Sequence, residues 1–375
     1  MNHPVKPFLE LALPGVKGLR PYQPGKPVEE LQREYGVSHA IKLASNENPL
    51  GPGRKALAAM QAAIRDVAIY PDGNGYCLKH KLAQHHGIAL EQITLGNGSS
   101  DVLEFVVRAF VSPEHEVLFS QHAFALYPIL TQAVNARAVV TPARQWGYDL
   151  AALRRAVSAG TRLIFIANPN NPTGTWIEGG DLEAFVADVP GDVLIVVDEA
   201  YYEYARHETR GSGKYPDTMA WIGRYPNLIV TRTFSKAYGL AGLRVGYAVS
   251  HPEVADLLNR VRPPFNVNSI ALAAATAGLD DQEHIAASVA VNSAGLQQLC
   301  AGFTAMGLNH IPSVANFVCV DVGQVAAPIY EALLYEGIIV RPIASYDMPQ
   351  HLRITVGRSE ENERVLNALQ KVLAR

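Results

Sequence analysis

Short apolar runs alternate with segments of helical periodicity through the middle of the chain. Apolar or β-branched runs predict strands at 92–95, 116–120, 138–141, 162–167, 193–197, 228–231 and 245–249. Apolar residues at helical spacing predict helices between several of them, at 101–111, 126–134, 150–159 and 181–189. Continuously apolar strands between amphipathic helices indicate a mostly parallel sheet that helices cover on both faces. The predicted fold class is α/β, with a seven-stranded sheet in a large domain.

The pattern changes on both sides of this region. Several prolines before residue 28 predict an extended arm, and a short helix is expected at 28–35. After residue 264 we predict two alanine-rich helices within 269–306, and then an α+β pattern: strands at 317–322, 338–341 and 352–356, and helices at 326–337 and 360–373. We therefore predict three parts: an N-terminal arm with the start of a small domain (1–48), a large domain (49–265) and a smaller C-terminal α+β domain (266–375).

Composition limits the classes of function. The chain has 375 residues and a formal charge of −3, without a block of Lys or Arg that would bind a nucleic-acid backbone. No apolar run approaches membrane-spanning length, and the apolar patch at 8–13 is too short for a secretory signal. The three cysteines are widely spaced, which fits neither a disulfide framework nor a metal cluster. We expect a cytoplasmic protein without a metal site.

The most informative stretch is TRTFSKAYGLAGLR, residues 231–244. Lys236 follows Ser235 just beyond a predicted strand, and a loop with two glycines then brings in Arg244. An amine beside a hydroxyl and a guanidinium suits a cofactor that carries an aldehyde and a phosphate, as pyridoxal phosphate does. Most lysines are solvated surface charges, so this interpretation depends on partners for the cofactor ring elsewhere in the chain.

Polar residues follow other strands at their carboxyl ends, where parallel α/β sheets bind ligands. Asp198 comes after five apolar residues, and its carboxylate would suit a pyridine nitrogen, although a helix N-cap or an ion pair is an equal alternative. Tyr201 and Asn171 could reach the phenolic oxygen of the ring, or be a half-buried aromatic and a turn asparagine. Ser99 and Ser100 open a helix whose N–H groups could bind a phosphate, or simply cap it.

Three further side chains are candidates for binding. Phe124 could stack on the cofactor ring, although core packing is the commoner use of a phenylalanine. Arg353 lies within an alternating strand of the predicted small domain, where it is either a solvent-facing residue or an anion anchor. Arg341 has a similar position after residues 338–340. Two arginines near one anion would suit a dianionic group better than a single carboxylate.

Taken together, these residues resemble those of the fold-type I pyridoxal-phosphate aminotransferases, and within them of the histidinol-phosphate aminotransferases. The resemblance covers essentially the whole chain. The stretches that carry it are PYQPGKP (21–27), LASNENP (43–49), YPDG (70–73), LGNGSSD (95–101), HAFALYP (122–128), NPNNPTGT (168–175), VDEAYYEY (197–204), TFSKAYGLAGLRVGY (233–247) and LRITVG (352–357).

The resemblance implies a role for each candidate. Lys236 would join the cofactor aldehyde and move the substrate proton, Asp198 would pair with the ring nitrogen, and Tyr201 would act beside them. Cofactor contacts are implied for Asn171, Phe124 (where the family often has tyrosine), Ser99, Ser100, Thr233, Ser235, Arg244 and, across a dimer interface, Tyr70. Substrate contacts are implied for Tyr22, Asn46, Arg341 and Arg353.

The implied activity is reversible amino transfer between glutamate and imidazole acetol phosphate, giving 2-oxoglutarate and histidinol phosphate, in histidine biosynthesis. The implied assembly is a homodimer. An aromatic-amino-acid aminotransferase or a threonine-phosphate decarboxylase shares this frame, and fold alone does not separate the three. A non-catalytic cofactor-sensing domain of a transcriptional regulator is an alternative from another class. It would accompany a basic helix-turn-helix segment, which we do not find at either end of the sequence.

Overall fold

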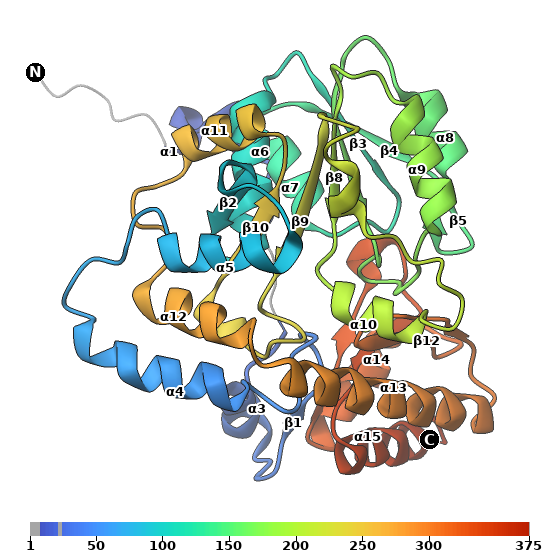
Figure 1. Cartoon of the computed structure of the whole chain (residues 1–375). Helices are drawn as coiled ribbons and strands as arrows, with labels where there is room; N and C mark the ends of the chain where they lie inside the picture. Colours follow the sequence, from blue (N-terminus) through green and yellow to red (C-terminus); the bar gives the residue numbers. More distant parts are fainter. Residues whose placement is uncertain (1–7, 22–24, 375) are drawn as a thin grey trace, which may run out of the picture.

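The seven predicted strands form one sheet in the computed structural model, which describes residues 8–21 and 25–374 (Figure 1). The strand order is β2-β10-β9-β8-β7-β3-β4, and β10 runs in the opposite direction to the other six strands of this sheet. The strands are β2 (Ile93–Gly96), β3 (Glu116–Ser120), β4 (Arg137–Thr141), β7 (Thr161–Ala167), β8 (Leu194–Asp198), β9 (Leu228–Thr233) and β10 (Gly246–Val249). The α/β fold class with a mostly parallel sheet is confirmed.

Helices cover both faces of this sheet, because side chains alternate along each buried strand. On β8, Ile195 and Val197 pack in one core cluster, while Leu194 and Val196 pack in the other. The first cluster is covered by α4 (Arg54–Ala63), α5 (Tyr76–His86), α8 (Leu150–Ala156), α9 (Gly179–Asp188) and α12 (Ser269–Gly278). The second is covered by α6 (Ser99–Phe110), α7 (Leu126–Ala133) and α11 (Pro252–Val261).

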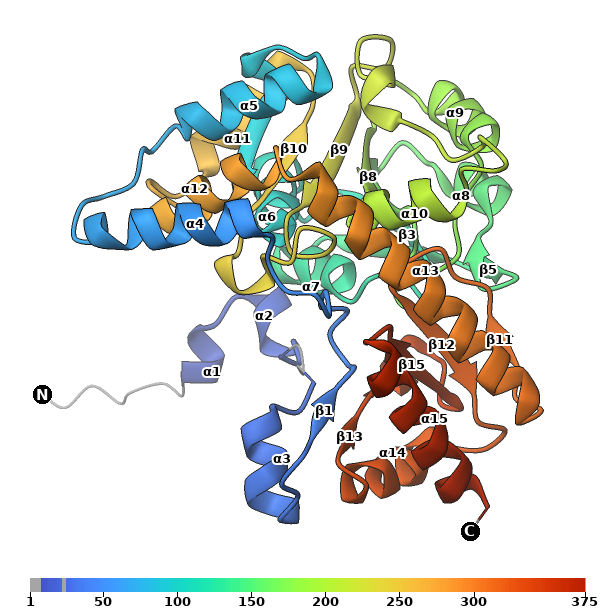
Figure 2. The ribbon, with the colours of Figure 1, turned by 60° about the horizontal axis from the view of Figure 1, so that its bottom comes forward.

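A second, four-stranded sheet is antiparallel. In Figure 2 the long helix α13 (Gln282–Ala305) runs between it and the large sheet. The strands of this second sheet, in order, are β11 (His310–Ile311), β12 (Phe317–Asp321), β15 (His351–Thr355) and β14 (Arg341–Pro342). The helices α14 (Ala326–Tyr335) and α15 (Ser359–Leu373) pack in its core. The N-terminal segment joins this part of the molecule, because β1 (Ile41–Lys42) pairs with β13 (Ile338–Ile339).

The division into domains stays a prediction. The pairing of β1 with β13 supports placing residues before 49 with the small domain. Helix α12, however, buries Ala271, Ala274 and Ala275 in the core cluster of the large sheet. This packing is a reason to place the second boundary later than residue 266.

The N-terminal arm differs from its prediction as an extended segment. Residues 8–21 contain two short helices, α1 (Phe8–Leu11) and α2 (Pro14–Lys17), before α3 (Val28–Tyr35). Pro14 is the first residue of α2, where a fixed φ and a missing N–H suit a helix. A Cβ at Gly15 would collide with the carbonyl of Gln132 on α7, so the glycine lets α2 approach the sheet domain closely. The expectation of an extended conformation was therefore wrong for Phe8–Leu11 and Pro14–Lys17, which are helical.

Other elements were not predicted. They are α5, α11, the short strands β1 and β11, the hairpin β5 (Ala143–Arg144) and β6 (Gly147–Tyr148), and α10 (Tyr202–Glu208). In the part of the chain that the structure describes, no helix combines the length and the apolar character needed to cross a bilayer.

A buried ion pair ties β8 to β9 on the face that α5 and α12 cover. Arg232 Nε donates to Glu199 Oε2 at 2.9 Å, and the two side chains are 4% and 0% exposed. Thr218 Oγ1 donates to the other carboxylate oxygen at 2.6 Å, and the guanidinium carbon of Arg232 lies 3.3 Å from the ring centroid of Tyr202. Both charges are therefore partnered without water.

Replacing the arginine of this pair should destabilise the fold strongly. Arg232→Met leaves Glu199 as an uncompensated buried charge, and we expect the free energy of unfolding to fall by about 3–5 kcal/mol. Urea denaturation followed by circular dichroism measures this change. The control is Arg260→Met, which breaks an exposed pair with Asp256 and should cost less than about 1 kcal/mol. Equal, small losses in the two variants would contradict the role given to the buried pair.

Candidate active site

A cavity of about 280 Å³ lies at the carboxyl ends of β7, β8 and β9. It brings together most of the predicted site residues, from segments far apart in the sequence. These are Asn46, Ser99, Ser100, Phe124, Asn171, Asp198, Tyr201, Thr233, Ser235, Lys236, Arg244 and Arg353.

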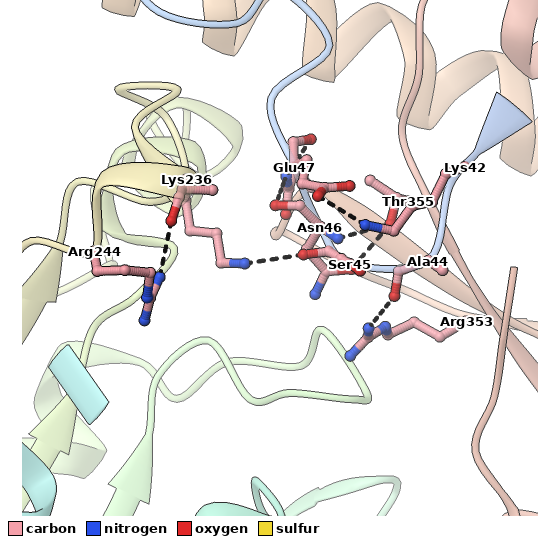
Figure 3. A network of polar contacts seen from close by, with 11 residues as sticks. Lys42, Ala44, Ser45, Asn46, Glu47, Lys236, Arg244, Arg353 and Thr355 are labelled. Atoms are coloured by element: carbon pink, nitrogen blue, oxygen red, sulfur yellow. Dashed lines mark hydrogen bonds and ion pairs between the residues drawn. The ribbon is translucent and has the colours of Figure 1, made fainter. Parts of the chain in front are cut away.

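The lysine amine crosses the cavity toward the N-terminal segment. Lys236 Nζ donates to the carbonyl oxygen of Ser45 at 3.2 Å, and it lies 5.6 Å from the ring centroid of Tyr201. Figure 3 shows Lys236 and Arg353 reaching from opposite sides toward the loop that carries Ala44 and Ser45. Loss of water around the amine, and then the charge of Arg353, lower the pKa of Lys236 to about 7. The amine is therefore substantially neutral, and nucleophilic, near neutral pH.

Asp198 is a buried carboxylate at the end of β8. Thr231 Oγ1 donates to Oδ1 at 3.0 Å, and Tyr127 Oη donates to Oδ2 at 3.1 Å. Burial raises the pKa of Asp198, and these two hydroxyl groups oppose that rise by stabilising the ionised form. The residue also lines the cavity, so its carboxylate can accept one more hydrogen from a ligand.

An anion site lies at the start of α6. The helix begins at Ser99 after Gly98, which has a φ of +86° and provides no side-chain cap. A Cβ at Gly98 would lie 2.5 Å from Arg244 Nη2, so glycine allows the guanidinium to lie against the helix start. Arg244 Nη1 donates to Ser235 Oγ at 3.2 Å. A helix N-terminus with a guanidinium and hydroxyl groups beside it is a phosphate-binding arrangement.

The opposite side of the cavity holds a second cation. Arg353 is 5% exposed, and its guanidinium donates to Asn171 Oδ1 at 2.5 Å and to the Ala44 carbonyl at 2.8 Å. Its Nε has no hydrogen-bond partner among residues 8–21 and 25–374, and no carboxylate in those ranges pairs with it. A buried guanidinium without a counter-ion is costly, so this position favours an anionic ligand.

Neutral polar groups complete this side. Asn46 Nδ2 donates to Tyr201 Oη at 2.8 Å, and burial raises the pKa of Tyr201 to about 12, so its phenol stays protonated. Because Arg353 engages the amide oxygen of Asn171, the NH₂ group of Asn171 is the end that can donate to a ligand oxygen.

Two of the described residues that were predicted for the site, Tyr70 and Arg341, do not line the cavity, and a third predicted residue, Tyr22, lies outside the described residues. Tyr70 is 80% exposed and stacks on Phe265, with ring centroids 4.8 Å apart. Arg341 lies on β14 directly opposite Arg353 of β15, so the two side chains share one face of the small sheet. The roles predicted for these three residues stay predictions.

Two residues that hold Asp198 were missed by the sequence analysis. Tyr127 lies three residues after Phe124 within HAFALYP, at a spacing that places both on one side of a helical turn. Thr231 is the register partner of Asp198 on the neighbouring strand. The strand order would have had to be known for the second of these contacts to be predicted.

The comparisons with known proteins agree with this arrangement. Residues 38–369 match the family Aminotransferase class I and II. The chain belongs to this family. It is 59% identical to histidinol-phosphate aminotransferase 1 of Nitrosococcus oceani, over 98% of each chain. It is 58% identical to histidinol-phosphate aminotransferase 2 of Pseudomonas fluorescens Pf0-1, over 98% of this chain and 99% of the relative.

A solved structure shares the architecture as well. It is the histidinol-phosphate aminotransferase of Sinorhizobium meliloti in complex with pyridoxal 5′-phosphate, with a TM-score of 0.88 and 31% identity. The match covers 96% of this chain and 97% of that one. The predicted resemblance to the fold-type I aminotransferases, and to the histidinol-phosphate aminotransferases among them, is therefore confirmed.

The low pKa of the lysine in this aminotransferase has a measurable consequence. In the cofactor-free protein, acetylation of Lys236 by a trace of acetic anhydride should reach half its maximal rate near pH 7. A lysine peptide in the same tube should reach it near pH ~10.4, the ordinary value of the amine. Peptide mass spectrometry across a pH series measures both. A Lys236 profile that follows the peptide would contradict a water-poor environment around the amine.

Proposed function

We propose that the chain catalyses reversible amino transfer between glutamate and imidazole acetol phosphate, giving 2-oxoglutarate and L-histidinol phosphate, in histidine biosynthesis. The observation that carries this proposal is the single cavity in which Lys236 and Asp198 lie between two cationic anchors, Arg244 and Arg353. One anchor suits a cofactor phosphate, and the other suits an anionic substrate. The identity of the chain with histidinol-phosphate aminotransferases supports this choice over the related activities.

The cofactor is pyridoxal 5′-phosphate, and the donor set of the cavity fits it. When bound, it supplies an electron-accepting ring that weakens the bond to the substrate's α-hydrogen. Lys236 Nζ would hold its aldehyde carbon, and Asp198 would accept the hydrogen of its ring nitrogen. The hydroxyl of Tyr201 and the NH₂ group of Asn171 would bind the ring oxygen, and Phe124 would cover the ring. The phosphate would be held by Ser99, Ser100, Thr233, Ser235 and Arg244.

Lys236 is also the proposed proton carrier. An amine with a pKa of about 7 is a base that works near neutral pH. Its Nζ would accept the proton of the substrate α-carbon once the substrate amine has replaced it on the cofactor. Tyr201, whose ring lies 5.6 Å from this nitrogen, would keep it oriented.

The substrate anions would bind at the small sheet. Arg353 and Arg341 share one face of it, and a pair of guanidinium groups suits the dianionic phosphate of one substrate and a carboxylate of the other. Asn46 would orient the bound substrate through the hydroxyl of Tyr201, to which it donates. Tyr22 is proposed as a further phosphate ligand from the resemblance alone.

We further propose a cytoplasmic homodimer whose active sites are shared across the interface. Tyr70 is exposed in the single chain, and a segment around it also exposes Ile64, Val67 and Ile69. Four apolar side chains close together on a surface indicate an interaction site. From such an interface, Tyr70 would reach the cofactor phosphate of the partner subunit. The three cysteines form no disulfide with one another, which supports a reducing compartment.

A substrate panel tests the proposed reaction. Specificity constants should favour imidazole acetol phosphate with glutamate over aromatic oxo acids, and threonine phosphate should release no carbon dioxide. Lys236→Ala should still bind the cofactor but lose multiple turnover, by at least ~10²-fold, because it lacks the proton carrier. Normal turnover in Lys236→Ala, or a preference for another substrate of the panel, would refute the proposal.

A mixture of two variants, each altered in a different residue of the proposed site and each expected to have little activity alone, tests the shared site. Tyr70→Ala supplies an intact Lys236, and Lys236→Ala supplies an intact Tyr70. If each site combines Lys236 of one subunit with Tyr70 of the other, refolding the two variants together should restore about a quarter of the wild-type activity, since half the dimers are mixed and each has one complete site. Refolding each variant alone is the control. No recovery in mixed dimers of confirmed composition would place Tyr70 outside the partner's site.

A further inference from the structure

The hydroxyl of Tyr127, which does not line the cavity, bonds the carboxylate of Asp198, which does. Tyr127 is fully buried on α7, and its Oη donates to Asp198 Oδ2 at 3.1 Å. Buried tyrosine hydroxyl groups need a hydrogen-bond partner, and most side-chain hydrogen bonds in proteins go to the backbone or to water. Here the partner is the carboxylate to which the proposed function assigns the cofactor nitrogen.

The other positions on this carboxylate are also occupied. Thr231 Oγ1 donates to Oδ1 at 3.0 Å, and the backbone N–H of Ala200 bonds the same carboxylate. An ionised carboxylate has about four acceptor positions, so three donors from the protein leave about one. Asp198 lines the cavity, so the remaining position is the one that a ligand can reach.

The ring of Tyr127 is itself held firmly. It stacks on Phe165 of β7 with centroids 4.4 Å apart and planes within 5° of parallel. Phe124, which lines the cavity, meets it edge to face, with centroids 5.8 Å apart and planes at 89°. Tyr127 thus contacts both the carboxylate and the aromatic wall proposed to hold the cofactor ring.

Resting on the proposed function, we propose that Tyr127 is a positioning residue that, together with Thr231, keeps Asp198 ionised and aimed so that the proton of the cofactor's ring nitrogen stays on nitrogen. The reason is electrostatic. Hydrogen bonds to a carboxylate stabilise its charged form, and burial acts against that form. Removing one hydroxyl makes Asp198 a stronger base, and the shared proton then moves toward the carboxylate. A ring without that proton is a weaker electron acceptor.

The test compares Tyr127→Phe, Thr231→Val and a matched control in the holoenzyme. The control, Tyr247→Phe, removes a buried hydroxyl from β10 of the same sheet, where it bonds His86 Nε2 at 2.8 Å instead of Asp198. Each protein is loaded with pyridoxal phosphate isotopically labelled at the ring nitrogen, and nitrogen NMR reports whether that nitrogen carries a proton. Steady-state kinetics give kcat and KM for both substrates.

We expect a protonated ring nitrogen in the wild type and in Tyr247→Phe, and a shift toward the neutral form in Tyr127→Phe and Thr231→Val. Loss of a hydrogen bond to a charged group should lower kcat roughly 10- to 100-fold, with little change in KM. If the ring nitrogen stays protonated in both variants, or if Tyr247→Phe shifts it equally, the inference is overturned. A wild type that binds no cofactor would instead overturn the proposed function.

Discussion

The constraint on which this site depends is a carboxylate buried at the end of a central strand. Asp198 is 5% exposed, and an isolated charge at such a position would cost several kcal/mol even after relaxation. The protein offsets that cost with donors from three different places: β9, α7 and the backbone just beyond β8. These donors, which stabilise the ionised form of the carboxylate, reach it only because the sheet, the helix and the turn are packed together. Its one remaining acceptor position faces the cavity.

Side-chain alternation gives two neighbouring carboxylates opposite surroundings. Asp198 and Thr231 face the side of the sheet that α6 and α7 cover, whereas Glu199 and Arg232 are one residue further along and face the other side. Glu199 is fully paired within the protein, so it can serve only the fold. Asp198 accepts hydrogen bonds from neutral groups and pairs with no arginine among the described residues, so one acceptor position of its carboxylate stays available to a ligand. A shift of register by one residue would exchange these environments.

Three cationic side chains line the cavity, and they repel one another. Arg244 lies at the start of α6, and Arg353 lies on the small sheet, with the half-buried Lys236 between them. Their mutual repulsion adds to the loss of water in lowering the pKa of the lysine. Anionic ligands that bind here would relieve this repulsion, and they would lie beside Ala44 and Ser45, which line the cavity and accept hydrogen bonds from Arg353 and Lys236. The N-terminal segment thus pairs with the small domain through β1 and also contributes Ala44 and Ser45 to the site.

The sequence by itself determined the seven strands of the large sheet, several of the helices that cover it and the residue types of the site. Buried strands and amphipathic helices have local periods, and the ends of apolar runs marked Asp198, Lys236 and Asn171 directly. Only the tertiary structure decided which side chains bond these groups. Tyr127 and Thr231 donate to Asp198, Asn46 donates to Tyr201, and Arg353 donates to Asn171. It also decided that α2 packs as a helix and that Tyr70 lies outside the cavity of its own chain. These contacts depend on strand order and on packing between segments far apart in the chain, for which local patterns carry no signal.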